Sequence, residues 1–159
     1  MRQSKLLIYT VILLLSVTMC KEPQITEYDL NLTDQQKATV SMRGVWGQPS
    51  DIVLPFGTTE TVLDNIILTF SINDDYSPAD FSSIGADDVF LASETATWNW
   101  KDATTLEDIE LNGVTPISQI KVFKGGGKLR LTFYYDGTSG GRVEGIGDYG
   151  VTLVKISPK

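Results

Sequence analysis

Apolar and polar residues alternate along several short segments that follow residue 44. The alternation is clear in 66–72 and 129–135 and is typical of strands that bury one face, and 149–156 alternates too, although both of its faces carry apolar groups. Shorter segments with strand character are 45–54, 89–92, 95–101, 108–111 and 117–124. Glycine-containing turn signals separate many of these segments. About eight short strands without intervening helices predict an all-β fold, either an antiparallel up-and-down barrel or a half-open sandwich.

One short helix is expected before the first strand. Thr33 and Gln36 have the spacing of a capping box, which predicts a helix over residues 34–42. Residues 39–42 also alternate like a strand, so that alternative stays open. The segment 73–88 is rich in Asp, Ser and Pro and is longer than a typical hairpin loop, so we interpret it as a long connection.

Five carboxylates fall within this long connection: Asp74, Asp75, Asp80, Asp87 and Asp88. Carboxylates at such density can coordinate Ca²⁺ together with backbone carbonyls. Their spacing does not match the EF-hand loop, and acidic loops are commonly just solvated. Calcium binding therefore stays a minor alternative, and we expect no metal site.

Residues 1–19 have the three parts of a secretory signal. Arg2 and Lys5 precede an apolar run over 6–17, which is shorter than the roughly 20 residues of a spanning helix. The run leads into Val17-Thr18-Met19-Cys20, which resembles the lipobox of bacterial lipoproteins, with Met19 in place of the usual small residue. The resemblance implies cleavage before Cys20 and lipidation of its thiol. The alternative is an ordinary signal peptide followed by an incidental cysteine.

The expected organisation is a lipoprotein signal peptide at 1–19, a lipidated Cys20 with a polar tether to residue 32, and a β domain over 33–159. Several acyl methylenes, each contributing about 0.8 kcal/mol, would hold the chain on a membrane. The residue after the cysteine is Lys21. An Asp at this position would favour retention in the inner membrane. We therefore expect the cell envelope, with the outer membrane favoured and the leaflet open.

Composition and charge exclude several kinds of partner and catalytic site. Apolar residues make up 42% of the chain and charged residues 21%, as in ordinary globular domains. The net charge is −7, and removal of the signal segment takes away two of the 13 basic residues, which makes the rest of the chain more acidic. An acidic chain repels the phosphate backbone, so nucleic acid is excluded as a partner. The chain has no histidine and one cysteine, which excludes histidine-based catalysis and internal disulfides. We expect no enzyme activity and no cofactor.

Gly44-Val45-Trp46 stands between the expected helix and the first strand, and it resembles the Gly-x-Trp signature at the start of lipocalin barrels. The resemblance implies a lipocalin-like barrel in which Trp46 closes one end. In that family an Arg from near the last strand often covers this Trp, and Arg142 is the nearest candidate. The implied activity is the binding of an apolar or amphipathic molecule, without catalytic residues.

Four aromatic residues are candidate ligand contacts: Trp98, Trp100, Tyr134 and Tyr135. Trp98 and Trp100 lie two apart, so on a strand both point to one face. The pair could stack on sugar rings or line an apolar pocket, although filling the core is the more common role.

Two functions from different classes stay open. The first is a non-catalytic binding module for an apolar small molecule or a glycan. The second is an accessory subunit that docks on another envelope protein and has no small ligand. A deep aromatic-lined cavity would favour the first, and an exposed apolar patch would favour the second.

Overall fold

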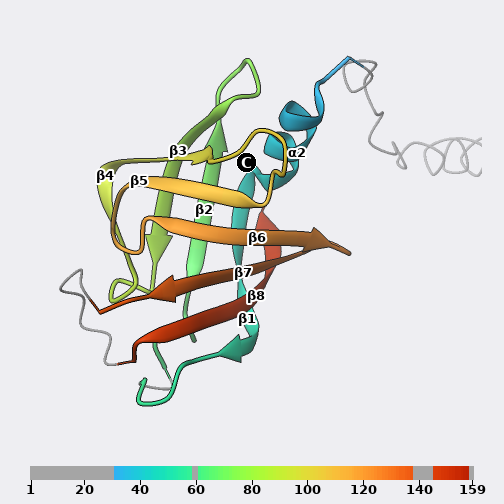
Figure 1. Cartoon of the computed structure of the whole chain (residues 1–159). Coiled ribbons are helices and arrows are strands. Elements are labelled where there is room, and N and C mark those ends of the chain that lie inside the picture. Colours follow the sequence, from blue (N-terminus) through green and yellow to red (C-terminus); the bar gives the residue numbers. More distant parts are fainter. Residues whose placement is uncertain (1–30, 59–60, 138–144, 158–159) are drawn as a thin grey trace, which may run out of the picture. The chain divides into compact units, whose positions relative to one another are not determined.

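The structure is a computed structural model that describes residues 31–58, 61–137 and 145–157. Its elements are α2 (Asp34–Met42), β1 (Gly44–Val53), β2 (Ile67–Ile72), β3 (Pro78–Ile84), β4 (Phe90–Trp100), β5 (Asp108–Pro116), β6 (Gln119–Gly125), β7 (Lys128–Tyr135) and β8 (Gly147–Ser157). Each strand pairs antiparallel with the next, and β8 closes the barrel against β1 (Figure 1). The expected all-β barrel is confirmed, in its closed form. The signal segment, Cys20 and Arg142 lie outside the described residues.

The helix α2 is the expected one, with the expected cap. The Gln36 backbone N–H donates to Thr33 Oγ1 at 3.2 Å, and the Thr33 N–H donates to Gln36 Oε1 at 3.0 Å. The strand alternative for residues 39–42 is wrong, because these residues form the last turn of α2. Thr39 and Met42 are the buried residues of this helix. No described helix is long and apolar enough to cross a membrane.

The interpretation of 73–88 as one long connection is wrong, because the segment contains β3. This strand pairs with β2, and Phe70 lies opposite Phe81. Phe81 is its only buried residue, and the inward positions on either side of it hold the small residues Ala79 and Ser83, so the strand carries little apolar signal. The segments 89–92 and 95–101 are instead one strand, β4, whose pairing with β5 is irregular between Ala92 and Thr97.

The strand β3 also separates the five carboxylates. Asp74 and Asp75 precede it, Asp80 lies within it, and Asp87 and Asp88 follow it, so the five do not form one site. Asp75 accepts hydrogen bonds from the Ser77 hydroxyl at 2.6 Å and the Ser77 N–H at 2.9 Å, and these bonds lower the pKa of its carboxyl. Among the described residues, no group of three or more acidic or cysteine side chains could hold a metal ion.

The inward face of the barrel is occupied by its own side chains. Phe70 packs edge-to-face on Phe81 and on Trp98, with ring centroids 5.2 and 5.4 Å apart. We call the end where β1 begins and β8 ends the α2 end, and the opposite end the loop end. At the loop end, Leu63 and Ile66 from the β1–β2 connection are fully buried in the same core. Side chains fill many eight-strand barrels in this way.

Candidate ligand-binding cleft

Trp98 and Trp100 lie together inside the barrel, as the two-residue spacing predicts. Their exposed fractions are 2% and 7%, and their rings meet edge-to-face at 5.5 Å. The Trp98 indole N–H donates to the carbonyl oxygen of Ser71 at 2.7 Å, and that of Trp100 donates to Thr39 Oγ1 at 2.8 Å. Both polar groups are thus bonded within the protein, and both rings are part of the core.

Tyr134 and Tyr135 point to opposite faces of β7, because neighbouring residues on a strand alternate. Tyr135 is buried at 3% exposure, whereas Tyr134 is 60% exposed on the outer face. The four aromatic candidates therefore do not share one surface. Tyr134 is the member of the set that a ligand can reach from solvent.

Trp46 is buried at the α2 end, where its indole N–H donates to the carbonyl oxygen of Met42 at 2.8 Å. Two ammonium groups lie over its ring, with Lys155 Nζ 5.3 Å and Lys124 Nζ 6.0 Å from the centroid. Lys155 comes from the last strand and lies opposite Trp46 in the β1–β8 register. A lysine of β8 thus lies over the tryptophan, and the position of Arg142, for which the resemblance suggested such a role, lies outside the described residues.

A cleft opens in the barrel wall where β6 and β7 separate. The two strands pair from Gly125 opposite Lys128 as far as Lys121 opposite Thr132. Beyond that point β6 continues along β5, while β7 stays paired with β8 as far as Tyr135. The space between them has a volume of about 330 Å³, at the small end of the range for ligand pockets. The sequence shows no sign of it, because it arises where a strand register ends.

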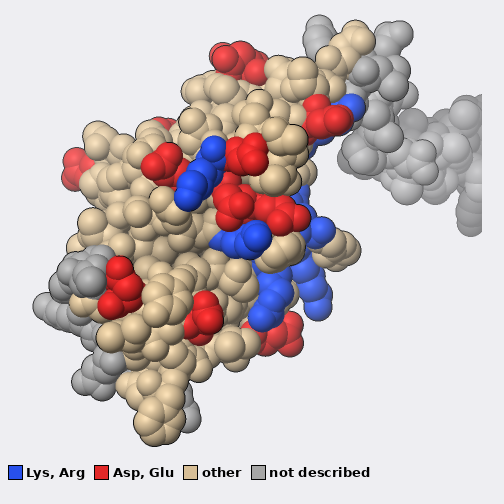
Figure 2. Space-filling view, viewed as in Figure 1, with Lys and Arg blue, Asp and Glu red and all other residues tan. Residues whose placement is uncertain are grey.

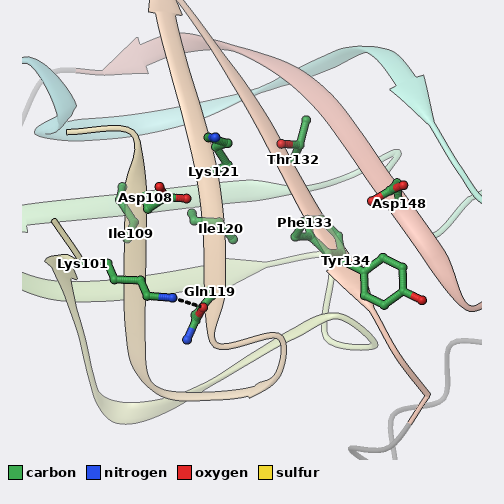
Figure 3. Close-up of a pocket in the computed structure, with 10 residues that line it drawn as sticks. All are labelled: Lys101, Asp108, Ile109, Gln119, Ile120, Lys121, Thr132, Phe133, Tyr134 and Asp148. Carbon is green, nitrogen blue, oxygen red and sulfur yellow. Dashed lines mark hydrogen bonds between the residues drawn. The ribbon is translucent and has the colours of Figure 1, made fainter. Parts of the chain in front are cut away.

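Charged and polar side chains from five strands or their ends surround this cleft (Figure 3). They are Lys101, Asp108, Gln119, Lys121, Thr132, Tyr134 and Asp148. Buried Ile109, Ile120 and Phe133 also line it, so the cleft reaches the apolar core. In Figure 3, Lys101 and Gln119 lie on one side of the opening, and Tyr134 and Asp148 on the other.

The cleft is balanced in charge, with two lysines and two aspartates. The Lys101 ammonium donates to Gln119 Oε1 at 2.8 Å, and the Lys121 ammonium lies 3.7 Å from a carboxylate oxygen of Glu107. Carboxylates accept hydrogen bonds, ammonium groups donate them, and the hydroxyls of Thr132 and Tyr134 do both. Such a lining suits a neutral ligand that carries many hydroxyl groups.

Comparison of the chain with protein-family models, with curated proteins and with solved structures found no match.

Proposed function

We propose that the chain is an envelope-anchored lipoprotein whose barrel is a non-catalytic binding module, with the β6–β7 cleft as its ligand site and a glycan as its ligand. The observation that carries the proposal is the separation of β6 and β7 beyond Lys121 and Thr132, which opens a polar cleft in the barrel wall. An eight-strand barrel is a known scaffold for such sites.

The cleft favours a glycan over an apolar molecule. An apolar ligand needs an apolar cavity, and the inward face of this barrel is packed with its own aromatic and aliphatic side chains. Sugar hydroxyls match the mixed donors and acceptors around the cleft, and the exposed ring of Tyr134 offers a surface on which a sugar ring can stack. Asp108 and Asp148 can accept bonds from those hydroxyls.

The anchoring part of the proposal is supported by the pattern of residues 1–20. A basic start, an apolar run and a cysteine at its end are the features of a lipoprotein signal. We place the protein in the cell envelope, lipid-anchored at Cys20 and on the outer membrane.

A second candidate function, docking on another envelope protein, has its own supporting observation. Apolar side chains are exposed at the loop end, where Phe56 is completely exposed and Ile146 is 59% exposed. Pro55, next to Phe56, lies so close to Gly147 that a Cβ on this glycine would be 2.9 Å from Pro55 Cβ. The segments that carry Phe56 and Ile146 are therefore neighbours. This apolar surface is separate from the cleft, so the two functions can be tested independently.

The test is a titration of the isotope-labelled full chain in detergent with oligomers of N-acetylglucosamine and of glucose, followed by NMR. We expect saturable shifts of the amide signals of Gln119, Lys121 and Thr132, and a loss of affinity of at least tenfold in Tyr134→Ala. Phe56→Ala is the matched control, because it removes an exposed aromatic ring at the loop end and should bind normally. Absence of shifts with every oligomer, or equal affinity in Tyr134→Ala, would overturn the glycan proposal.

A further inference from the structure

Three basic residues lie at the α2 end of the barrel. Arg43 directly follows α2, Lys124 lies near the end of β6, and Lys155 lies near the end of β8. Figure 2 shows basic side chains grouped along one side of the barrel, below α2 and around the turn between β6 and β7. We call Arg43, Lys124 and Lys155 the basic triad.

The two lysines of the triad continue inward-facing rows of the barrel. On β6 the row runs through the buried Ile120 and Val122 to Lys124, and on β8 the buried Val151 and Leu153 precede Lys155. Both ammonium groups lie within about 6 Å of the Trp46 ring centroid. They thus stand over the end of the core.

The Lys124 and Lys155 side chains are exposed at the rim of the barrel, but the core beneath them partly removes their ammonium groups from water. Burial lowers the pKa of Lys124 to about 8, and repulsion from Lys155 adds to the effect. Burial also lowers the pKa of Lys155, with repulsion from Arg43 as the second cause. The two lysines share the Trp46 ring, and Arg43 lies three residues before Trp46 at the start of β1.

Within the described part of the chain, no carboxylate neutralises the triad. The ion pairs found there join Lys37 to Asp34 and Lys121 to Glu107. The full chain carries 20 acidic side chains against 13 basic ones, yet none of the described acidic side chains forms an ion pair with the triad. A cluster of like charges without a counter-ion costs stability, and binding of an anion relieves that cost.

We propose that Arg43, Lys124 and Lys155 form a binding site for a phosphate group. A phosphate has oxygens that point in several directions and carries up to two negative charges, which suits donors that arrive from three separate elements. A planar carboxylate would use fewer of them. Beside Lys124, the turn at Gly125, Gly126 and Gly127 has no atoms within 4 Å of where their Cβ atoms would stand, so approach to the site is open.

This site is distinct from the β6–β7 cleft and does not depend on the glycan proposal. Its phosphate could be a free anion or the headgroup of a phospholipid, because both present the same oxygens. The experiment therefore needs one arm for each source.

In the first arm, the full chain in uncharged detergent is titrated with inorganic phosphate at constant ionic strength, and binding is followed by NMR at the amide signals of Gly125, Gly126 and Gly127. In the second arm, the same chain is mixed with vesicles of phosphatidylcholine alone or with added phosphatidylglycerol, and the bound fraction is measured by flotation. Any lipid anchor acts equally on both vesicle types, so the difference between them reports the headgroup.

We expect saturable binding in at least one arm, reduced at least tenfold in the double variant Lys124→Gln, Lys155→Gln. Lys37→Gln is the matched control, because it removes the same charge from the surface of α2 and should bind normally. The double variant Lys124→Arg, Lys155→Arg changes the same two positions but keeps both charges and should retain binding, so loss of binding in both double variants would point to a fold defect. Binding in the first arm alone assigns a free anion, and binding in the second assigns a headgroup. Absence of binding in both arms, or unchanged binding in the glutamine double variant, overturns the proposal.

Discussion

The indole N–H of Trp100 donates to the hydroxyl of Thr39, and this bond joins β4 to α2 across the α2 end of the barrel. The Thr39 hydroxyl also donates to the carbonyl oxygen of Gln35 at 2.8 Å, so it acts as donor and acceptor at once. Thr39 is completely buried. The helix is therefore attached to the barrel by a buried polar contact as well as by apolar packing.

Replacing this hydroxyl should weaken the fold. Thr39→Val keeps the shape of the side chain but leaves the Trp100 N–H buried without a partner, so we expect the free energy of unfolding to fall by about 1–3 kcal/mol. Urea denaturation measures the change. In a Trp100→Phe background the donor is already gone, so Thr39→Val should lower the free energy of unfolding by less. An equal loss in both backgrounds would show that the hydrogen bond does not stabilise the fold.

Stability should rise with pH in the alkaline range. The pKa of Lys124 is about 8 in the folded protein, below the ordinary value of 10.5, so the unfolded chain binds more protons between these values. The penalty for the charged ammonium is fully present below pH 8 and disappears as pH rises towards 10.5. Lys124→Met should be more stable than the parent chain at neutral pH and should show a smaller rise above pH 8.

Denaturation curves between pH 7 and 10 check this prediction at constant salt. The pKa of Lys155 is also lowered, so Lys124→Met should keep part of the rise in stability with pH. Lys37→Met, which alters a lysine on the surface of α2, serves as the control. A parent chain whose stability does not change over this range would contradict the argument.

Two glycines with similar backbone angles should respond differently to a methyl group. Gly85 and Gly57 have φ values of +72° and +86°, which L-residues rarely adopt. A Cβ at Gly85 would overlap the carbonyl oxygen of Asn65, whereas a Cβ at Gly57 meets no atom within 4 Å. We expect Gly57→Ala to cost about 1–2 kcal/mol of backbone strain and Gly85→Ala clearly more. Equal losses in thermal or urea denaturation would argue against the steric contribution.

Cys20 carries the anchoring proposal. Cys20→Ala should abolish incorporation of a labelled fatty acid and should move the protein from the membrane fraction to the soluble fraction after cell lysis. Cys20→Ser is a second variant with a nearly unchanged shape and the same expected result. Full membrane retention in both variants would rule out lipidation as the means of attachment.

The regular parts of the fold were predictable because burial on one face leaves a period of two in the sequence. The segment 129–135 alternates throughout and is β7, which runs from Lys128 to Tyr135. The strand β3 escaped prediction because Phe81 is its only large inward residue, between the small Ala79 and Ser83. The ladder with β2 therefore defines this strand rather than its composition. The helix was predictable from its cap, since Thr33 and Gln36 bond one another locally.

The sites were less predictable, for reasons that differ. The β6–β7 cleft depends on where two strands stop pairing, which no local pattern records. Tyr134 was singled out from the sequence together with residues that prove to be buried, because composition does not reveal which face of a barrel closes inward. The lysines of the basic triad did leave a signal, because Lys124 and Lys155 occupy the next inward position after two apolar residues on their strands.

Closure of the barrel between β1 and β8 also has a consequence for the newly made chain. Among the described strands β1 comes first and β8 last, so the seam between them cannot form until the chain as far as residue 157 is available. Until then β1 and β7 present unpaired edges, which are templates for association with other strands. A chain truncated before Gly147 would keep both edges unpaired, so the eleven-residue strand β8 removes two templates for aggregation at once.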